Sequence, residues 1–121
     1  MNKFQAIQSF WASFGLPAYD EQDLPDDAAL PYITYSASAD NIGNKLNQNA
    51  SLWYRSNSWR EISQKADEIA EDIGYGFKCL KVDGGFLYIT RGTPFAQRMK
   101  DESEEIKRIY INIQAEFLTA T

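Results

Sequence analysis

Hydrophobic residues recur along the chain in two periods, one typical of helices and one typical of strands. Apolar side chains at three- and four-residue spacing predict a helix over Met1 to Phe14, which Gly15 and Pro17 end. A second helix is predicted to begin at Ser58 and to end at Gly74, with charged residues opposite an apolar stripe. The stripe consists of Trp59, Ile62, Ala66, Ile69, Ala70 and Ile73.

The start of the second helix carries a capping signal. The run Ser58-Trp59-Arg60-Glu61 has the form S-x-x-E. In a capping box of this form the serine hydroxyl accepts a hydrogen bond from the Glu61 amide, and the glutamate carboxylate accepts one from the Ser58 amide. We therefore expect Ser58 to be the cap of this helix.

Five segments have the composition and alternation of strands. The longest, Ile106 to Leu118, alternates between an apolar and a polar side and predicts a strand with one buried face. Asp83-Gly84-Gly85 joins two of the five in a predicted tight hairpin, because these residues tolerate positive φ angles. The five predicted strands are Pro31 to Ser36, Ala50 to Arg55, Phe77 to Val82, Phe86 to Arg91 and Ile106 to Leu118.

Polar or turn-rich segments predict three long loops, Tyr19 to Leu30, Ala37 to Gln48 and Gly92 to Glu105. The resulting element order is helix, strand, strand, helix and three strands. This order predicts an α+β fold in a single domain, residues 1–121, with two layers. We expect a mainly antiparallel or mixed sheet of about five strands with both helices on one face.

Composition restricts the chemistry that the chain can perform. The 121 residues include one cysteine and no histidine, which excludes an internal disulfide, a histidine base and, in practice, a Cys/His metal site. No apolar run approaches the roughly 20 residues that span a bilayer. Since no signal-peptide pattern is present either, we expect a cytoplasmic protein.

No segment has the pattern of an active site or of a bound cofactor. The glycines at 74, 76, 84 and 85 fit a helix exit and a hairpin better than a phosphate loop, and the acidic residues fit no calcium-loop spacing. Composition does not exclude a serine–lysine pair or paired carboxylates, but the acids are placed where they serve solubility. We therefore expect no enzyme activity, cofactor, metal or small-molecule substrate.

Strand aromatics leave a nucleic-acid interface open as an alternative, because exposed aromatics on a sheet stack with bases. The net charge of −5 argues against it, since an acidic protein repels phosphate. The candidates for stacking are Tyr32, Tyr54, Phe86, Tyr88 and Tyr110.

Two segments in or beside the predicted loops carry opposite charge. The first, Tyr19 to Leu30, has five acids and no lysine or arginine: Asp20, Glu21, Asp23, Asp26 and Asp27. The second, Arg91 to Lys100, has three basic residues and no acid, and its candidate interface residues are Arg91, Phe95, Arg98, Met99 and Lys100. Phe95 and Met99 either fold back on the core or dock on a neighbour. The acidic loop is either a solvated connection or a surface for a partner, and the two loops are a candidate interface between copies.

Four runs together resemble the small tail-terminator or tail-completion proteins that join head and tail in long-tailed bacteriophages and prophages. The resemblance covers Pro31 to Thr119. The runs are PYITYS, SLWYRSNSWREISQKADEIAEDIG, KVDGGFLYITRGTPFAQRM and IKRIYINIQAEFLT.

The resemblance implies a structural protein without catalytic residues. Such proteins form a hexameric ring that caps the tail tube and contacts the head-completion or connector protein. They assemble in the bacterial cytoplasm and remain in the virion tail. A head–tail connector, a neck protein or a minor tail component is the nearest alternative, and a nucleic-acid-binding or regulatory module is a more distant one.

Overall fold

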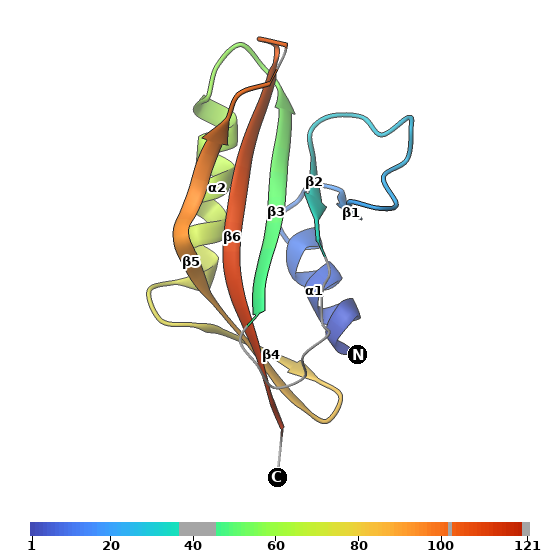
Figure 1. The fold of residues 1–121 in the computed structure, drawn as a ribbon, viewed down its shortest axis with the longest axis vertical. Coiled ribbons are helices and arrows are strands. Elements are labelled where there is room, and N and C mark those ends of the chain that lie inside the picture. The colour runs from blue at the N-terminus through green and yellow to red at the C-terminus, as the bar shows by residue number, and fades with distance from the viewer. Residues whose placement is uncertain (37–45, 102, 120–121) are drawn as a thin grey trace.

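The computed structural model of the chain describes residues 1–36, 46–101 and 103–119, and these form two helices and six strands (Figure 1). The strands make one sheet in the order β1-β2-β3-β6-β5-β4, in which only β1 and β2 are parallel. The predicted α+β class is confirmed, with one strand more than expected. The elements are α1 (Lys3–Ala12), β1 (Ala18–Asp20), β2 (Tyr32–Tyr35), β3 (Leu46–Arg55), α2 (Arg60–Ile73), β4 (Lys78–Val82), β5 (Gly85–Met99) and β6 (Ile106–Thr119).

The last strand of the chain lies in the middle of the sheet. β6 pairs with β3 along one side and with β5 along the other, in both cases antiparallel. Its predicted alternation is confirmed, because Ile109, Ile111 and Ile113 are buried while the residues between them are half-buried. One face of the sheet is therefore apolar along its whole centre.

Both helices cover that apolar face and leave the other face without a helix (Figure 1). α2 lies across β3, β5 and β6, and α1 lies beside β1 and β4. The predicted stripe of α2 is confirmed, with four of its residues buried and Trp59 half-buried at the edge of the core. The helical side chains in the core are Ala6, Ile7, Phe10 and Trp11 from α1, and Ile62, Ala66, Ile69 and Ile73 from α2.

The predicted capping box at Ser58 is wrong. The second helix begins at Arg60, with Trp59 as its cap residue, and no side chain caps it. The Ser58 hydroxyl accepts from the amide of Arg60 at 3.1 Å and not from that of Glu61. Because the helix begins later than predicted, Ile62 stands at the third helical position, where a capping box needs a glutamate. A complete capping box occurs instead in α1, between Asn2 and Gln5.

All three predicted loops contain strand residues. Ala18 to Asp20, which overlap the start of the acidic loop, pair with β2 as β1. The segment expected to be a loop over Gly92 to Glu105 continues β5 as far as Met99. The predicted loop over 37–48 lies outside the described residues up to 45, and its last three residues belong to β3.

A bulge allows β5 to pass through the turn-like residues that suggested a loop. The pairing register with β6 shifts between Arg91 and Ala96, so that the intervening residues leave the regular ladder. Asn112 of β6 donates to the Pro94 carbonyl at 3.1 Å across this bulge. A Cβ atom at Gly92 would lie 2.8 Å from the Asn112 carbonyl oxygen, so the close approach of the strands requires glycine there.

We expect Gly92→Ala to lower the free energy of unfolding by about 1–3 kcal/mol, because the added methyl group must displace the backbone of β6. Gly76→Ala is the matched control, since a Cβ atom at Gly76 meets nothing within 4 Å. Urea denaturation of both variants measures the difference. Equal stabilities of the two variants would contradict the close packing at the bulge.

Candidate assembly surfaces

The outer side of β5 is covered over only part of its length. β4 pairs with Gly85 to Ile89, whereas β6 pairs with β5 as far as Met99. Residues Ala96 to Met99, here called the free half-edge, have no strand on their outer side within the described part of the chain. All four are exposed, as is Lys100 after them. Every second residue of such an edge directs its backbone N–H and C=O groups away from the sheet.

The edge at β1 is blocked instead. The Pro17 carbonyl accepts from Ile33 of β2, so the carbonyls of Ala18 and Asp20 point away from the sheet. The Ala18 carbonyl accepts from Gln8 Nε2 of α1 at 3.2 Å, and the Asp20 carbonyl accepts from the Asp23 amide at 2.9 Å. The two sides of the sheet therefore differ: the outward acceptors of β1 are already bonded, whereas on the other side β5 extends uncovered beyond its pairing with β4.

The five predicted acidic residues lie in one segment, Asp20 to Asp27, here called the acidic segment, in which Asp20 ends β1 and is half-buried and the residues after it are exposed. Local turns hold it, because Asp20 Oδ1 accepts from the Gln22 amide at 3.0 Å and the Pro25 carbonyl accepts from the Ala28 amide at 3.1 Å. None of its five carboxylates forms an ion pair with a described residue. The segment thus presents uncompensated negative charge.

Two of the predicted basic residues lie at the free half-edge. The Arg98 guanidinium lies 5.0 Å from the centre of the Trp59 ring and is in no ion pair among the described residues. Lys100 is exposed directly after the strand and is likewise unpaired within the same residues. Met99, on the helix-free face, is 37% exposed. These three side chains are accessible to a partner.

The other two predicted residues point toward α2 instead. Arg91 Nη2 donates to the Ala70 carbonyl in the last turn of α2 at 2.6 Å. Its guanidinium lies 4.8 Å from the Tyr75 ring centre and 5.9 Å from that of Phe95. Phe95 is half-buried and packs against the core. Arg91 therefore ties the bulge of β5 to the end of α2.

The helix-free face carries an aromatic and cationic cluster that the sequence did not reveal. Trp53 Nε1 donates to Thr34 Oγ1 at 2.9 Å, and Arg108 Nε donates to Ser51 Oγ at 3.0 Å. The Arg108 guanidinium lies 4.6 Å from the Trp53 ring centre. Only the register of β2, β3 and β6 brings these residues together. Of the proposed stacking residues, Tyr54 is buried on the opposite face, under α2.

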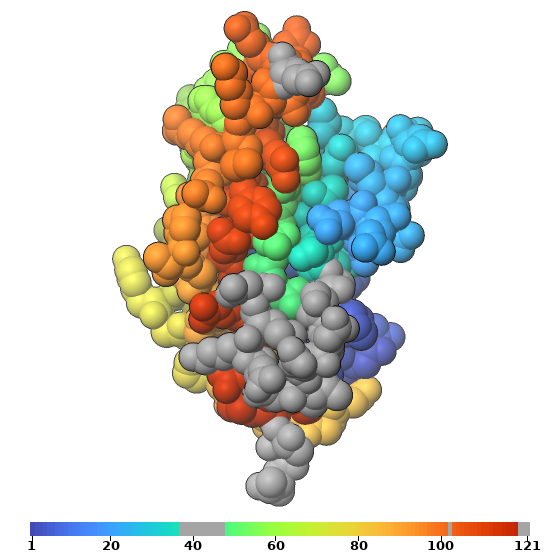
Figure 2. Space-filling view, viewed as in Figure 1, coloured from blue at the N-terminus to red at the C-terminus, as the bar shows by residue number. Residues whose placement is uncertain are grey.

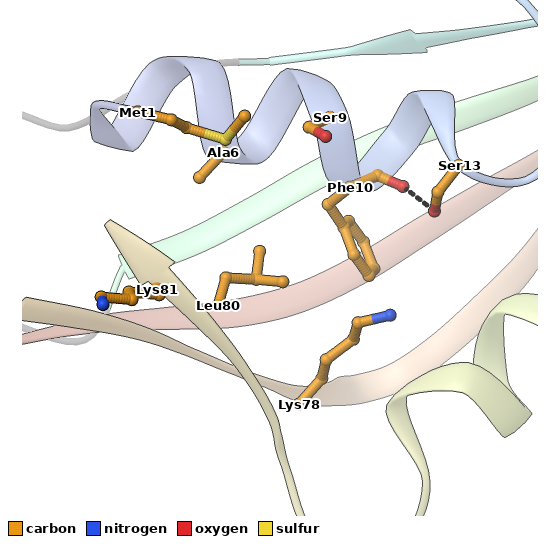
Figure 3. A pocket seen from close by; sticks show the side chains of 8 residues that line it. All are labelled: Met1, Ala6, Ser9, Phe10, Ser13, Lys78, Leu80 and Lys81. Atoms are coloured by element: carbon orange, nitrogen blue, oxygen red, sulfur yellow. Dashed lines mark hydrogen bonds between the residues drawn. The ribbon is translucent and has the colours of Figure 1, made fainter. Parts of the chain in front are cut away.

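A shallow hollow lies between α1 and β4 (Figure 3). Phe10 and Leu80 form its apolar walls, and Lys78 lies at its rim. Ser13 donates to the Phe10 carbonyl at 2.6 Å, and Lys78 pairs with Asp72 at 2.5 Å. The Ser13 hydroxyl and the Lys78 ammonium group are thus engaged with other groups of the protein.

The described residues contain no group of three or more metal-ligating side chains that could hold an ion. Neither α1 nor α2, the helices found in residues 1–36, 46–101 and 103–119, has the length and apolar character to cross a membrane.

Two buried tyrosines have altered ionisation. Burial raises the pKa of Tyr35 above its ordinary value, and the carboxylates of Asp20 and Asp23 in the acidic segment raise it further. The Tyr35 hydroxyl donates to Gln8 Oε1. Burial also raises the pKa of Tyr54, with contributions from Glu61 and Glu68 of α2. Both phenols therefore favour the neutral form in the folded protein.

The sequence matches no protein-family model and has no significant match among curated proteins. The structure is similar to a chain in a solved structure described as the virion of a native gene transfer agent (GTA) particle. The TM-score is 0.58 at 12% sequence identity, and the match covers 94% of this chain and 90% of that chain. At this identity the likeness establishes a shared fold over nearly the whole of both chains.

We expect Arg91→Met to lower the free energy of unfolding by about 1.5–3 kcal/mol, because it removes a charge-assisted hydrogen bond to the end of α2. Arg98→Met is the control, since its exposed stacking on Trp59 contributes about 0.5–1 kcal/mol. Chemical denaturation measures both variants. The role of Arg91 is refuted by a variant that unfolds at the same denaturant concentration as the control.

Stability should fall as pH rises above 10.0, the ordinary tyrosine pKa. The unfolded chain loses its phenolic protons there, whereas the folded protein with raised pKa values retains them, so unfolding becomes more favourable. Tyr54→Phe should remove part of this alkaline loss. Denaturation midpoints on either side of pH 10 measure it, and an identical alkaline loss in the variant would contradict the burial argument.

Proposed function

We propose that this protein is a structural component of a phage or prophage tail, namely a tail terminator that forms a ring at the end of the tail tube. The observation that supports it is the shared fold with a chain of a gene transfer agent virion, extending over 94% of this chain. The sequence resemblance to tail-terminator and tail-completion proteins over Pro31 to Thr119 supports it independently.

The arrangement of the described residues favours an assembly role over catalysis. The Ser13 hydroxyl and the Lys78 ammonium group at the hollow beside α1 are engaged with other groups, and the best-defined exposed features are a strand edge and charged segments. Unpaired edges and complementary charges are means by which protein copies associate. The function is then non-enzymatic and consists of presenting surfaces in a fixed geometry.

In this role the protein assembles in the bacterial cytoplasm and stays in the virion tail. Its partners are other copies of itself, a tail tube protein and a head-completion or connector protein. The resemblance favours six copies. A ring seated on the tube stops further addition of tube subunits and provides the surface to which the head attaches.

A head–tail connector, a neck protein or a minor tail component is the second candidate. The virion whose chain shares the fold is described as a whole particle, and this description fits these roles as well as it fits a terminator. The candidates differ in what happens to tails when the protein is missing.

Electron microscopy of particles assembled without this protein tests the proposal. We expect tails longer than those of the complete particles, because nothing stops addition to the tube. Supplying the intact protein in trans should restore normal length. Separated tails of normal length beside filled heads would replace the terminator with a joining role, and complete infectious particles would refute both.

A further inference from the structure

We infer that neighbouring copies in the ring meet through the free half-edge of β5 on one copy and the acidic segment on the next. This inference rests on the proposed function and identifies the surfaces that close the ring. The occupant of the free half-edge is accordingly a second copy of this chain.

The strand order places these two surfaces on opposite sides of the molecule. β1, from which the acidic segment continues, is one edge of the sheet. The free half-edge lies on the other side, where β4 no longer covers β5. A contact between unlike surfaces on opposite sides repeats from copy to copy, and it forms either a closed ring or an open helix.

Both surfaces lie at a similar level along the long axis of the molecule. In Figure 1 the upper part of β5 is on the left, and the loop that follows β1 is on the right at about the same height. Figure 2 shows both at the surface. A rotation about an axis parallel to the long axis of the molecule therefore relates two copies whose surfaces meet. No shift of one copy along that axis is needed. Repetition without a step closes into a ring, whereas a step would produce a filament.

The charges of the two surfaces are complementary and unused within the chain. Arg98 and Lys100 form no ion pair with a described residue, and neither do the five carboxylates of the acidic segment. Carboxylates accept hydrogen bonds from guanidinium, ammonium and backbone N–H groups, and the free half-edge together with Lys100 presents all three. Opposite charges also steer copies into this orientation during assembly.

Pairing of two free half-edges with each other is less favourable. It would bring Arg98 and Lys100 of one copy near the same residues of the other, and like charges across an interface oppose association. It would also give a two-fold pair, because the same surface is used on both copies. Such a pair cannot by itself grow into a ring.

Charge exchange tests the contact. The double variant Arg98→Glu, Lys100→Glu should lose the ring, because both surfaces are then negative. The triple variant Asp23→Lys, Asp26→Lys, Asp27→Lys should lose it as well, because three lysines against the two remaining acids leave the segment with a net positive charge that faces the basic half-edge. All five substitutions in one chain restore unlike charges at every contact, whatever the number of copies. We expect this quintuple variant to regain the ring. Light scattering after size exclusion, with and without tail tubes, measures assembly.

The control for the double variant is Arg60→Glu, Lys81→Glu, which changes the net charge equally at exposed positions outside both surfaces. It should assemble like the unaltered protein. Thermal melts show whether each variant is folded, and a double variant that fails to fold is replaced by Arg98→Gln, Lys100→Gln, for which we expect a weakened ring.

The results separate this inference from the proposed function. If the unaltered protein forms a ring and the double and triple variants form it equally well, the proposed contact is wrong, although the ring itself is still formed. Loss of the ring in the double and triple variants without recovery in the quintuple variant also refutes the contact. A protein that stays monomeric at every concentration and on tail tubes contradicts the terminator proposal itself.

Discussion

The pairing of β6 with a long strand on each side is the constraint on which the rest of the structure depends. Its side chains alternate, so one register decides which residues of β3 and β5 face the helices. Ile109, Ile111 and Ile113 form the floor on which α2 packs. A shift of one residue would expose all three and bury the polar side chains between them. The hydrophobic core and the positions of both sheet edges therefore follow from a single ladder.

The bulge in β5 allows the pairing with β6 to continue past residues 92–95, which do not fit the regular ladder. Gly92 lets the strands approach, and Pro94 receives a hydrogen bond from Asn112 that keeps the departure local. Arg91, just before the bulge, bonds to the end of α2 and stacks beside Phe95. The helix layer and the sheet are thus joined at the point where the sheet is least regular, and the free half-edge that follows is held in a defined position.

Much of the fold could be predicted from the sequence, because periodic patterns report directly on burial. The stripe of α2 and the alternation of β6 both give correct elements. The errors concern features that local pattern does not encode. β1 has only three residues and is defined by its pairing with β2, and the glycine and proline of the bulge look like a loop. The sequence showed the opposite charges of the two segments, but only the strand order places them on opposite sides of the sheet.

The difference between the two sides of the sheet also limits aggregation of the protein through its strand edges. Strand-by-strand aggregation requires a molecule to offer an open edge on both sides, so that each addition creates a new site for the next. Here the Gln8 side chain and the Asp23 amide occupy the outward carbonyls of β1, whereas on the opposite side of the sheet β4 and the free half-edge of β5 have no further strand within the described residues. A molecule whose sheet is open on one side can pair edge to edge with one other molecule, but the pair then has no open side by which to grow. A chain with long, strongly alternating strands is thereby protected from strand-by-strand growth into fibrils.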